Sequence, residues 1–434
     1  MRKSVFALLA AAVLAFGSGC ATDVQDIEKL NYASALGVDY KDGQYYGYIQ
    51  FIDFQSVAKT DGQKPAAKIW VGEGVGKSFE ESFFDLYRSA QERIYWGHVT
   101  AVLISESAFK QGFREISDSI SRYYEFRLTP WVFGTRESIK EIFTAAGFFG
   151  QSPLSTILHE PEGTYTQASL IKSVQFHRLI GQIRESIKEI FTAAGFFGQS
   201  PLSTILHEPE GTYTQASLIK SVQFHRLIGQ IYEPGYTSCI PTIALNRTDW
   251  QEKQKKEPKL MLDGAIFLKS EKFRSYMPLK ELEGLRWVQH GTVRAGIPVP
   301  SESDSTAQIV VDEPKTKLKP VSAGEELYFD MNMKATGYVV NRVNNRTRGL
   351  GPLTAQTKEA IEREIRQTYE NGRKKQTDVF NLEHNLYRNR YREWKALSEQ
   401  KEPLLTKDAI RHIEIDLNIT HSSSQKNKRI TRNE

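Results

Sequence analysis

Apolar and polar positions in the first third of the chain predict a hairpin followed by a capped helix. Two runs rich in Tyr, Ile, Phe and Val lie on either side of Asp42-Gly43, a dipeptide typical of two-residue hairpin turns. From residue 79 to residue 90 the apolar side chains recur at helical spacing. Ser78 and Glu81 stand at the start of this segment with the spacing of a capping box.

A buried strand and a second helix are predicted next. Residues 99–105 form a short apolar run, and between residues 109 and 120 the Phe and Ile side chains return to helical spacing. The order strand, helix, strand, helix predicts a mixed α/β N-terminal part with several subdomains.

The second half of the chain changes from strand to helix periods and back again. Strands are predicted at 259–269, 307–313 and 325–341, and the last alternates apolar with polar residues, which predicts a sheet with one wet face. Residues 354–397 have helical spacing, and residues 411–420 alternate as a final strand. We therefore expect an α+β C-terminal domain with a largely antiparallel sheet and long helices, and an α+β fold class overall.

A polar stretch suggests where the domains divide. Residues 247–259 are almost wholly polar and carry five positive charges, so we interpret them as a linker. The N-terminal domain then covers 20–246 and the C-terminal domain 260–421. Residues 422–434 form a basic end, expected to be a solvated tail or, alternatively, a contact with anionic lipid headgroups.

An exact repeat interrupts the N-terminal domain. Residues 136–183 and 184–231 are two adjoining copies of 48 residues without a single difference. Solenoids usually need three or more units and tolerate drift at exposed positions, so this repeat indicates a recent tandem duplication or an assembly error in a 386-residue protein. One copy is expected to protrude as a helical hairpin with a poorly covered apolar face, and a continuous helix is expected across the seam, over 167–193.

The start of the chain has the pattern of an export signal. Two positive charges, an apolar run of about 12 residues and small residues lead to Cys20. This run is shorter than the roughly 20 residues that a spanning helix needs. We predict a lipoprotein signal over 1–19 and lipid attachment at Cys20; plain secretion is the alternative. If Cys20 carries lipid, Cys239 has no intramolecular partner, which excludes a disulfide framework.

Composition and charge exclude several classes of function. The chain is 40% hydrophobic and 25% charged, which is ordinary for a globular protein. Its formal net charge of +5 is too small to indicate a nucleic-acid partner.

Two motifs resemble chemical sites but lack the required spacing. In GEGVGKS at 72–78 only three residues separate Gly72 from Gly76, where a phosphate loop needs four, so we expect a turn leading into the capped helix. HEPEG, at 159–163 and 207–211, offers possible metal ligands, but its Pro excludes the one-face helical arrangement of zinc proteases. A loop between helices is the favoured interpretation, and no metal or cofactor is predicted.

No residue pattern indicates a catalytic nucleophile. GxSxG is absent, and Cys239 lies in an apolar strand-like run where a free Cys packs as a small hydrophobe. No catalytic residue is therefore predicted, and we do not expect an enzyme.

Several segments together resemble a known family. The stretches 93–109, 264–287 and 377–394 and the final alternating strand, all behind a lipoprotein signal, are similar to the C-subunit lipoproteins of bacterial spore nutrient-germinant receptors, the Ger(x)C family. The chain departs from the family pattern at Ala21, where Trp is usual, and at Asn381 and Glu383, where Gly is usual.

This resemblance implies a function without catalysis. It implies a membrane-anchored subunit that acts beside a multi-pass A subunit and a transporter-like B subunit, on the outer face of the spore inner membrane, in nutrient-triggered germination. Only Cys20 transfers as a site residue, as the point of lipid attachment. The alternative is an extracytoplasmic solute-binding lipoprotein that captures a small nutrient directly.

Overall fold

The computed structural model describes residues 30–420 apart from 53–67, 91, 123–124, 146, 148–153, 155, 161–221, 253, 290–291, 293, 301–305, 324–325, 342–349 and 401–405. The predicted signal peptide with Cys20, the tail at 422–434 and the predicted seam helix over 167–193 lie outside the described residues.

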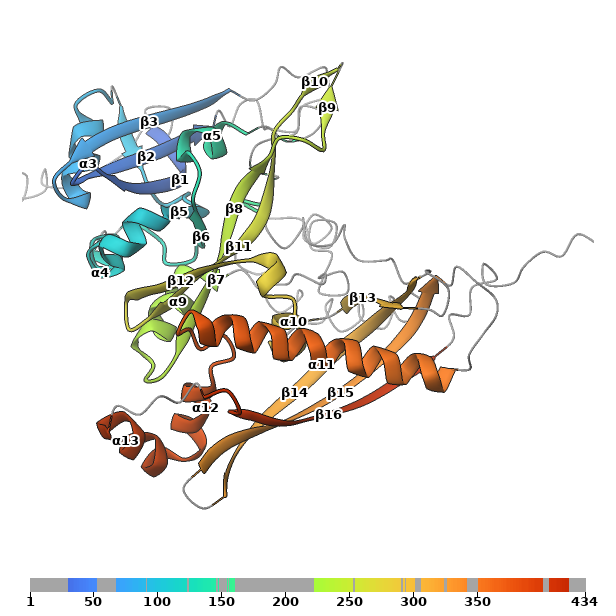
Figure 1. Cartoon of the computed structure of the whole chain (residues 1–434). Coiled ribbons are helices and arrows are strands. Elements are labelled where there is room, and N and C mark those ends of the chain that lie inside the picture. The colour runs from blue at the N-terminus through green and yellow to red at the C-terminus, as the bar shows by residue number, and fades with distance from the viewer. Residues whose placement is uncertain are drawn as a thin grey trace, which may run out of the picture.

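A ten-stranded mixed sheet forms the upper half of the molecule (Figure 1). Its main path runs β12-β11-β8-β6-β5-β1-β2-β3, with β4 beside β1 and β7 beside β6. The strands β1, β5, β6 and β8 are parallel, and the two flanks are antiparallel. The strands are β1 Leu30–Lys41, β2 Gln44–Ile52, β3 Ile69–Gly76, β4 Arg93–Tyr95, β5 Ala101–Ser105, β6 Trp131–Thr135, β7 Val222–Gln223, β8 Thr237–Asn246, β11 Lys259–Lys269 and β12 Lys272–Pro278.

Helices cover both faces of this sheet. On one face lie α3 (Phe79–Tyr87), α4 (Glu106–Arg122) and α9 (Phe224–Tyr232), and on the other lies α5 (Ile139–Thr144). The central strand β5 is buried along its whole length, because alternate residues face the two cores. The predicted buried strand and the helix after it are therefore confirmed, as is the mixed α/β character of this part.

The predicted hairpin and capping box are both present. Asp42 and Gly43 connect β1 to β2 with positive φ angles of 51° and 77°, as a two-residue turn between twisted strands requires. At the start of α3 the Ser78 hydroxyl accepts a hydrogen bond from Glu81 N at 3.2 Å, and the Glu81 carboxylate accepts one from Lys77 N at 2.7 Å.

The glycine-rich stretch before α3 is a strand and not the predicted turn. Gly72, Gly74 and Gly76 lie in β3, and α3 packs directly on them. A Cβ atom on Gly74 would lie 2.1 Å from the Ser82 carbonyl oxygen. The glycines therefore allow close helix packing, and the sequence alone does not reveal this tertiary reason.

The predicted linker is also different in the structure. Residues 247–259 lead through β9 (Gln251–Glu252) and β10 (Lys255–Lys256), which pair with each other, and end at the start of β11. Because β8 and β11 pair from Asn246 and Lys259 onward, the polar stretch is the end of a long hairpin within one sheet. The sheet therefore continues across the predicted domain boundary.

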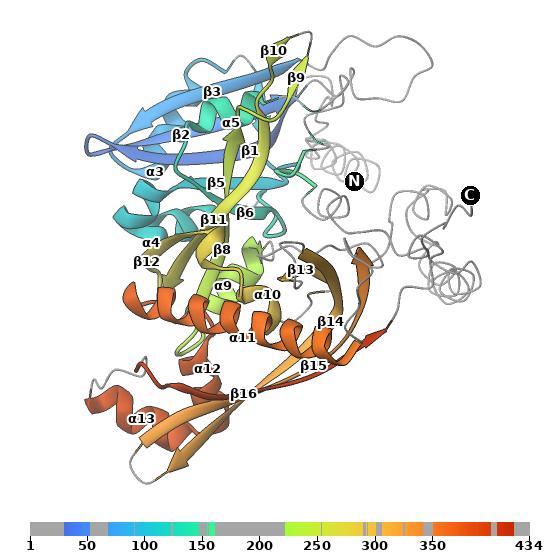
Figure 2. The same ribbon diagram turned by 45° about the vertical axis from the view of Figure 1, so that its right-hand side comes forward.

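A four-stranded sheet, β13-β14-β15-β16, forms the lower half (Figure 2). The first three strands are antiparallel, and β15 and β16 are parallel. Its elements are β13 Arg294–Pro300, β14 Thr306–Ala323, β15 Glu326–Asn341 and β16 Ile410–Thr420, with η3 Leu279–Glu281, α10 Leu285–Val288, α11 Leu350–Lys374, α12 Leu382–Asn389 and α13 Tyr391–Gln400.

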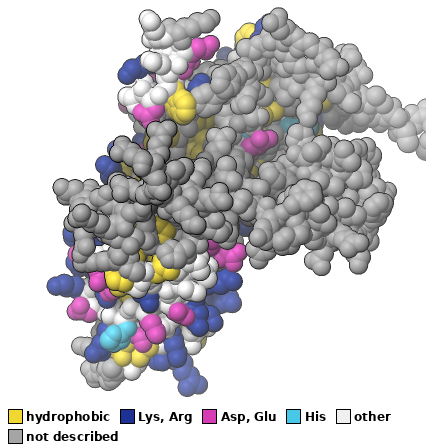
Figure 3. Space-filling model, turned by 90° about the vertical axis from the view of Figure 1, so that its right-hand side faces the viewer, with side chains coloured by type: hydrophobic (Ala, Val, Ile, Leu, Met, Phe, Trp, Pro, Cys, Tyr) yellow, Lys and Arg dark blue, Asp and Glu magenta, His cyan; other side chains and the backbone are white. Residues whose placement is uncertain are grey.

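One face of this second sheet packs against α11 and the other is wet. Phe329, Met331 and Met333 of β15 share a core with Ile361 and Ile365 of α11. The opposite face exposes polar side chains, and Lys and Arg are frequent in the lower part of Figure 3. The predicted alternation and the α+β fold class are confirmed.

The two copies of the repeat supply different elements. The first copy provides α5, and the second provides β7 and α9. Val222 and Gln223 form the short strand β7, in which Gln223 pairs with Trp131 of β6. The prediction that one copy protrudes as a helical hairpin falls on residues outside those described.

Candidate functional site

The carboxyl ends of the parallel strands bring polar side chains together. Ser105 at the end of β5 is the register partner of Thr135 at the end of β6, and Asp39 lies at the end of the neighbouring β1. Ligands of open α/β sheets bind at such an edge, so these side chains are candidates for a site.

Asp39 is held in a closed network at this edge. Its carboxylate accepts a hydrogen bond from the Ser107 hydroxyl at 2.9 Å and lies 2.5 Å from Lys41 Nζ. Burial alone would raise the pKa of Asp39, but the hydrogen bonds from Lys41, Ser105 and Ser107 outweigh it and lower the pKa. The carboxylate is therefore a stable, paired anion, not a proton donor.

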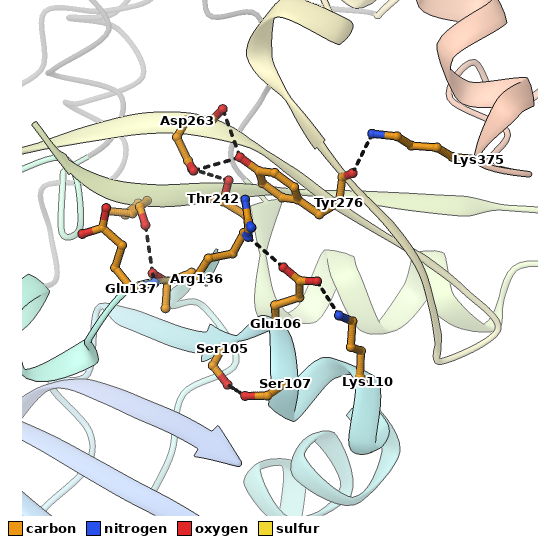
Figure 4. Close-up of polar contacts among 12 residues, drawn as sticks. Ser105, Glu106, Ser107, Lys110, Arg136, Glu137, Thr242, Asp263, Tyr276 and Lys375 are labelled. Carbon is orange, nitrogen blue, oxygen red and sulfur yellow. Dashed lines mark hydrogen bonds and ion pairs between the residues drawn. The ribbon is translucent and has the colours of Figure 1, made fainter. Parts of the chain in front are cut away.

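A second network extends from β5 toward the lower half (Figure 4). Glu106 lies between Lys110, at 2.6 Å, and Arg136, at 3.0 Å. The Arg136 guanidinium stacks over the ring of Tyr276, 4.5 Å from its centroid. Tyr276 in turn accepts a hydrogen bond on its carbonyl from Lys375 Nζ at 3.2 Å.

The Asp263 carboxylate accepts hydrogen bonds from two hydroxyl groups next to this stack. The Tyr276 hydroxyl donates to Asp263 at 2.9 Å, and Thr242 Oγ1 donates at 2.5 Å. Burial, together with Asp263, raises the pKa of Tyr276 to about 12, so the phenol keeps its proton. The network thus connects strands of the upper sheet to the end of α11 through neutral and paired groups.

The turn before α12 makes a joint between the two halves of the molecule. We define the joint as residues 377–384 together with the segment 234–237 that it contacts. Asn381 has left-handed backbone angles, φ 54° and ψ 42°, and its side-chain oxygen accepts a hydrogen bond from Thr237 N at 2.6 Å. This contact fixes the start of α12 against the start of β8.

Further contacts cross the joint on both sides of Asn381. Thr377 shares a hydrogen bond with Ser275 of β12 at 2.8 Å, and Glu383 forms an ion pair with Lys269 of β11. His384 packs edge-on against the ring of Tyr236, with centroids 5.0 Å apart. The turn is therefore bonded to three strands of the upper sheet.

The close fit of the joint depends on Gly235. Its φ of +71° is in the region that favours glycine, and an added Cβ atom would lie 3.1 Å from the Glu383 backbone. Substitution at this position therefore affects both the turn and the contact with α12.

His159 and Glu160, the described part of the first HEPEG copy, lie outside any helix or strand, and His159 is a structural residue. Its Nε2 atom lies 2.9 Å from Gln50 Oε1 and its Nδ1 atom 2.5 Å from Thr100 Oγ1. Burial lowers the pKa of His159 to about 3, so the ring stays neutral. His207, in the second copy, lies outside the described residues.

Neither a metal centre nor a reactive thiol is found in the part of the chain that the structure describes. No three His, Cys, Asp or Glu side chains group there as metal ligands. Cys239 packs beside the lower core, and burial raises the pKa of its thiol to about 12. Over the same residues, no helix has both the length and the apolar character to cross a membrane.

Two family models match the chain, one in each half. Residues 23–187 match the spore germination protein N-terminal domain, and residues 263–423 match the GerAC-like C-terminal domain of spore germination proteins. These matches cover 165 and 161 residues, which is three quarters of the chain. The chain belongs to the Ger(x)C family.

Other comparisons add little detail about this Ger(x)C protein. A crystal structure of the GerBC protein covers 92% of this chain and 99% of its own, at 15% identity and a TM-score of 0.45. No curated protein sequence matches the chain.

Only one side of the joint of this Ger(x)C protein lies between the segments that the two models match. The segment 234–237 falls after the first match, which ends at residue 187, and the turn 377–384 falls inside the second. Sequence reasoning missed the joint, because no local pattern links residues about 140 positions apart. The one signal was Asn381, which occupies a position where the family usually has Gly, and the left-handed backbone there explains that preference.

Proposed function

We propose that this chain is the non-enzymatic, lipid-anchored C subunit of a spore nutrient-germinant receptor. Cys20 would carry the lipid and hold the folded domains on the outer face of the spore inner membrane, beside the A and B subunits. The observation that carries the proposal is the match of both family domains in order along one chain.

The described polar groups support a role without catalysis. Asp39 and His159 form hydrogen bonds with other residues of the fold, and the Cys239 thiol stays protonated because burial raises its pKa. A nucleophile or general base needs a pKa matched to its task and access to substrate, and these groups have neither. Anchoring would instead support assembly with other membrane subunits, since it raises the effective concentration of the domains toward them.

The anchor is tested by replacing Cys20 with Ala. We expect the Cys20→Ala protein to leave the membrane fraction and germination through this receptor to fall, with folding unchanged. The control is Cys239→Ala, which removes the other cysteine and should keep membrane attachment. Full membrane attachment of Cys20→Ala would overturn the anchoring part of the proposal.

The carboxyl edge of the upper sheet favours a second candidate, direct capture of a small nutrient. Glu106 and Arg136 stand near the edge where α/β sheets bind ligands, and a carboxylate beside a guanidinium suits the two charges of a zwitterion. Thermal unfolding of the purified protein with single amino acids and sugars tests this candidate. A ligand that binds the native state raises the melting temperature, whereas a subunit that does not contact nutrient shows no shift.

A further inference from the structure

Asp378 is a buried carboxylate at the centre of the joint. Its side chain is 6% exposed, and one of its oxygens, Oδ2, accepts a hydrogen bond from Glu383 N at 2.8 Å. The other oxygen, Oδ1, is buried without a hydrogen-bond partner among the described residues. The hydroxyl of Thr237, across the joint, is likewise buried and unpaired within the described part of the chain.

Among the described residues, no cation forms an ion pair with this carboxylate. The titratable groups that face it are Lys269 of β11, Glu383 of α12 and Tyr369 of α11, and Cys239 lies on the adjoining strand β8. Lys269 forms its ion pair with Glu383, and the carboxylate of Glu383 repels that of Asp378. An ionised Asp378 is therefore a buried charge, and Lys269, the cation that acts on it, is already paired with Glu383.

We propose that Asp378 makes the joint between the two halves sensitive to pH: its neutral form holds the turn 377–384 against β8, and its ionisation loosens that contact. The inference is independent of the proposed function, since it concerns how the two halves are held together. It rests on the position of a buried, incompletely bonded carboxyl group within the contact between the two halves.

The direction of the pH effect follows from the linkage between closure of the joint and protonation of Asp378. Burial raises the pKa of Asp378 to about 6, against 3.8 for the unperturbed group. The closed joint therefore binds the proton more tightly than an opened joint in which water reaches the carboxylate. Closure is favoured below pH 4 and is progressively lost as the pH rises through 6, at which the closed form itself ionises.

Hydrogen exchange measures this loosening directly. We would follow amide exchange in the full chain, purified in detergent, at pH 5 and pH 7.5, after correction for the intrinsic chemical rate. The two pKa values predict that opening of α12 and of the start of β8 increases about tenfold over this interval. Helix α4, in the upper half away from the joint, should show no comparable change.

Two variants separate Asp378 from other carboxylates. Asp378→Asn resembles the neutral acid, so its α12 exchange should change less than about twofold between the two pH values. Asp416→Asn, which alters an exposed carboxylate on β16, should keep the tenfold response of the wild type.

Two outcomes would overturn the proposal. If α12 of Asp378→Asn keeps the tenfold pH response of amide exchange, that response belongs to another group. If exchange in α12 and α4 of the wild type changes equally with pH, the effect is not local to the joint. If Asp378→Asn fails to fold, an equal change in α12 and α4 of the wild type still overturns the proposal.

Discussion

His159 Nε2 lies 2.9 Å from Gln50 Oε1, so a histidine of the repeated segment is bonded to a strand 109 positions earlier in the chain. The side-chain amide of Gln50 also donates a hydrogen bond, from its own Nε2 atom, to the Phe143 carbonyl at 2.7 Å. Both contacts use the first copy of the repeat. Phe191 and His207, the counterparts in the second copy, lie outside the described residues.

The neutral, buried ring of His159 predicts a pH dependence of stability. Its folded pKa of about 3 is below the ordinary 6.5, so the unfolded chain gains a proton first as the pH falls. Stability is then fully present above pH 6.5 and is lost as the pH falls toward 3. Between pH 7 and pH 5 the loss from this residue should be about 2 kcal/mol, measured by urea unfolding at both values.

The duplicate supplies the control for this prediction. His159→Gln should remove the pH-dependent loss, whereas His207→Gln, in an identical local sequence, should behave as the wild type. A loss that disappears in the His207 variant would show that the second copy, not the first, contacts Gln50.

Asn381 should contribute to stability through both its backbone and its side chain. Asn381→Gly keeps the left-handed turn but leaves Thr237 N, in a residue that is 1% exposed, without its acceptor, which costs about 1–3 kcal/mol. Asn381→Ala loses the same acceptor and keeps a Cβ atom in the left-handed region, which the glycine variant lacks, so it should be roughly 1–2 kcal/mol less stable than Asn381→Gly. Denaturant unfolding of the two variants measures both terms; equal losses would contradict the backbone contribution.

Local patterns predicted those elements whose causes are local. The alternation over 327–333 follows the pleat of one strand, and Ser78 with Glu81 caps the helix that they begin. The glycines of β3 were interpreted as a turn, because the local pattern does not show that α3 packs on them. Residues 247–259 were interpreted as a linker, because their polar composition does not show that β8 and β11 on either side of them pair. The joint could not be predicted at all, since it depends on how two sheets meet.

Which copy of the repeat enters the core could not be predicted either, because the two are identical. The lengths of the connections decide which copy supplies each element. The first copy supplies α5, because α5 follows β6 directly, and the second copy supplies α9, because only four residues separate α9 from β8. Sequence identity carries no information about this choice, whereas the lengths of the connections do.

Substitution in α9 tests this choice of copies. Phe224 is fully buried in the upper core, so Phe224→Ala should cost about 3–5 kcal/mol. Phe176 is its counterpart in the first copy, and Phe176→Ala should leave the free energy of unfolding unchanged. If only the double variant loses stability, the copies exchange and the fixed choice is wrong.

Deletion of one copy should leave the fold intact. Removing 184–231 yields the same chain as removing 161–208, because the copies are identical, and the second description removes only residues outside those described. The connection from residue 160 to residue 222 then shortens from 61 to 13 residues. By chain entropy alone, this shortening raises the free energy of unfolding by about 1 kcal/mol. We therefore expect an equal or higher melting temperature and retained germination in spores that carry the shortened gene; failure of the 386-residue chain to fold would show that the duplication has become part of the structure.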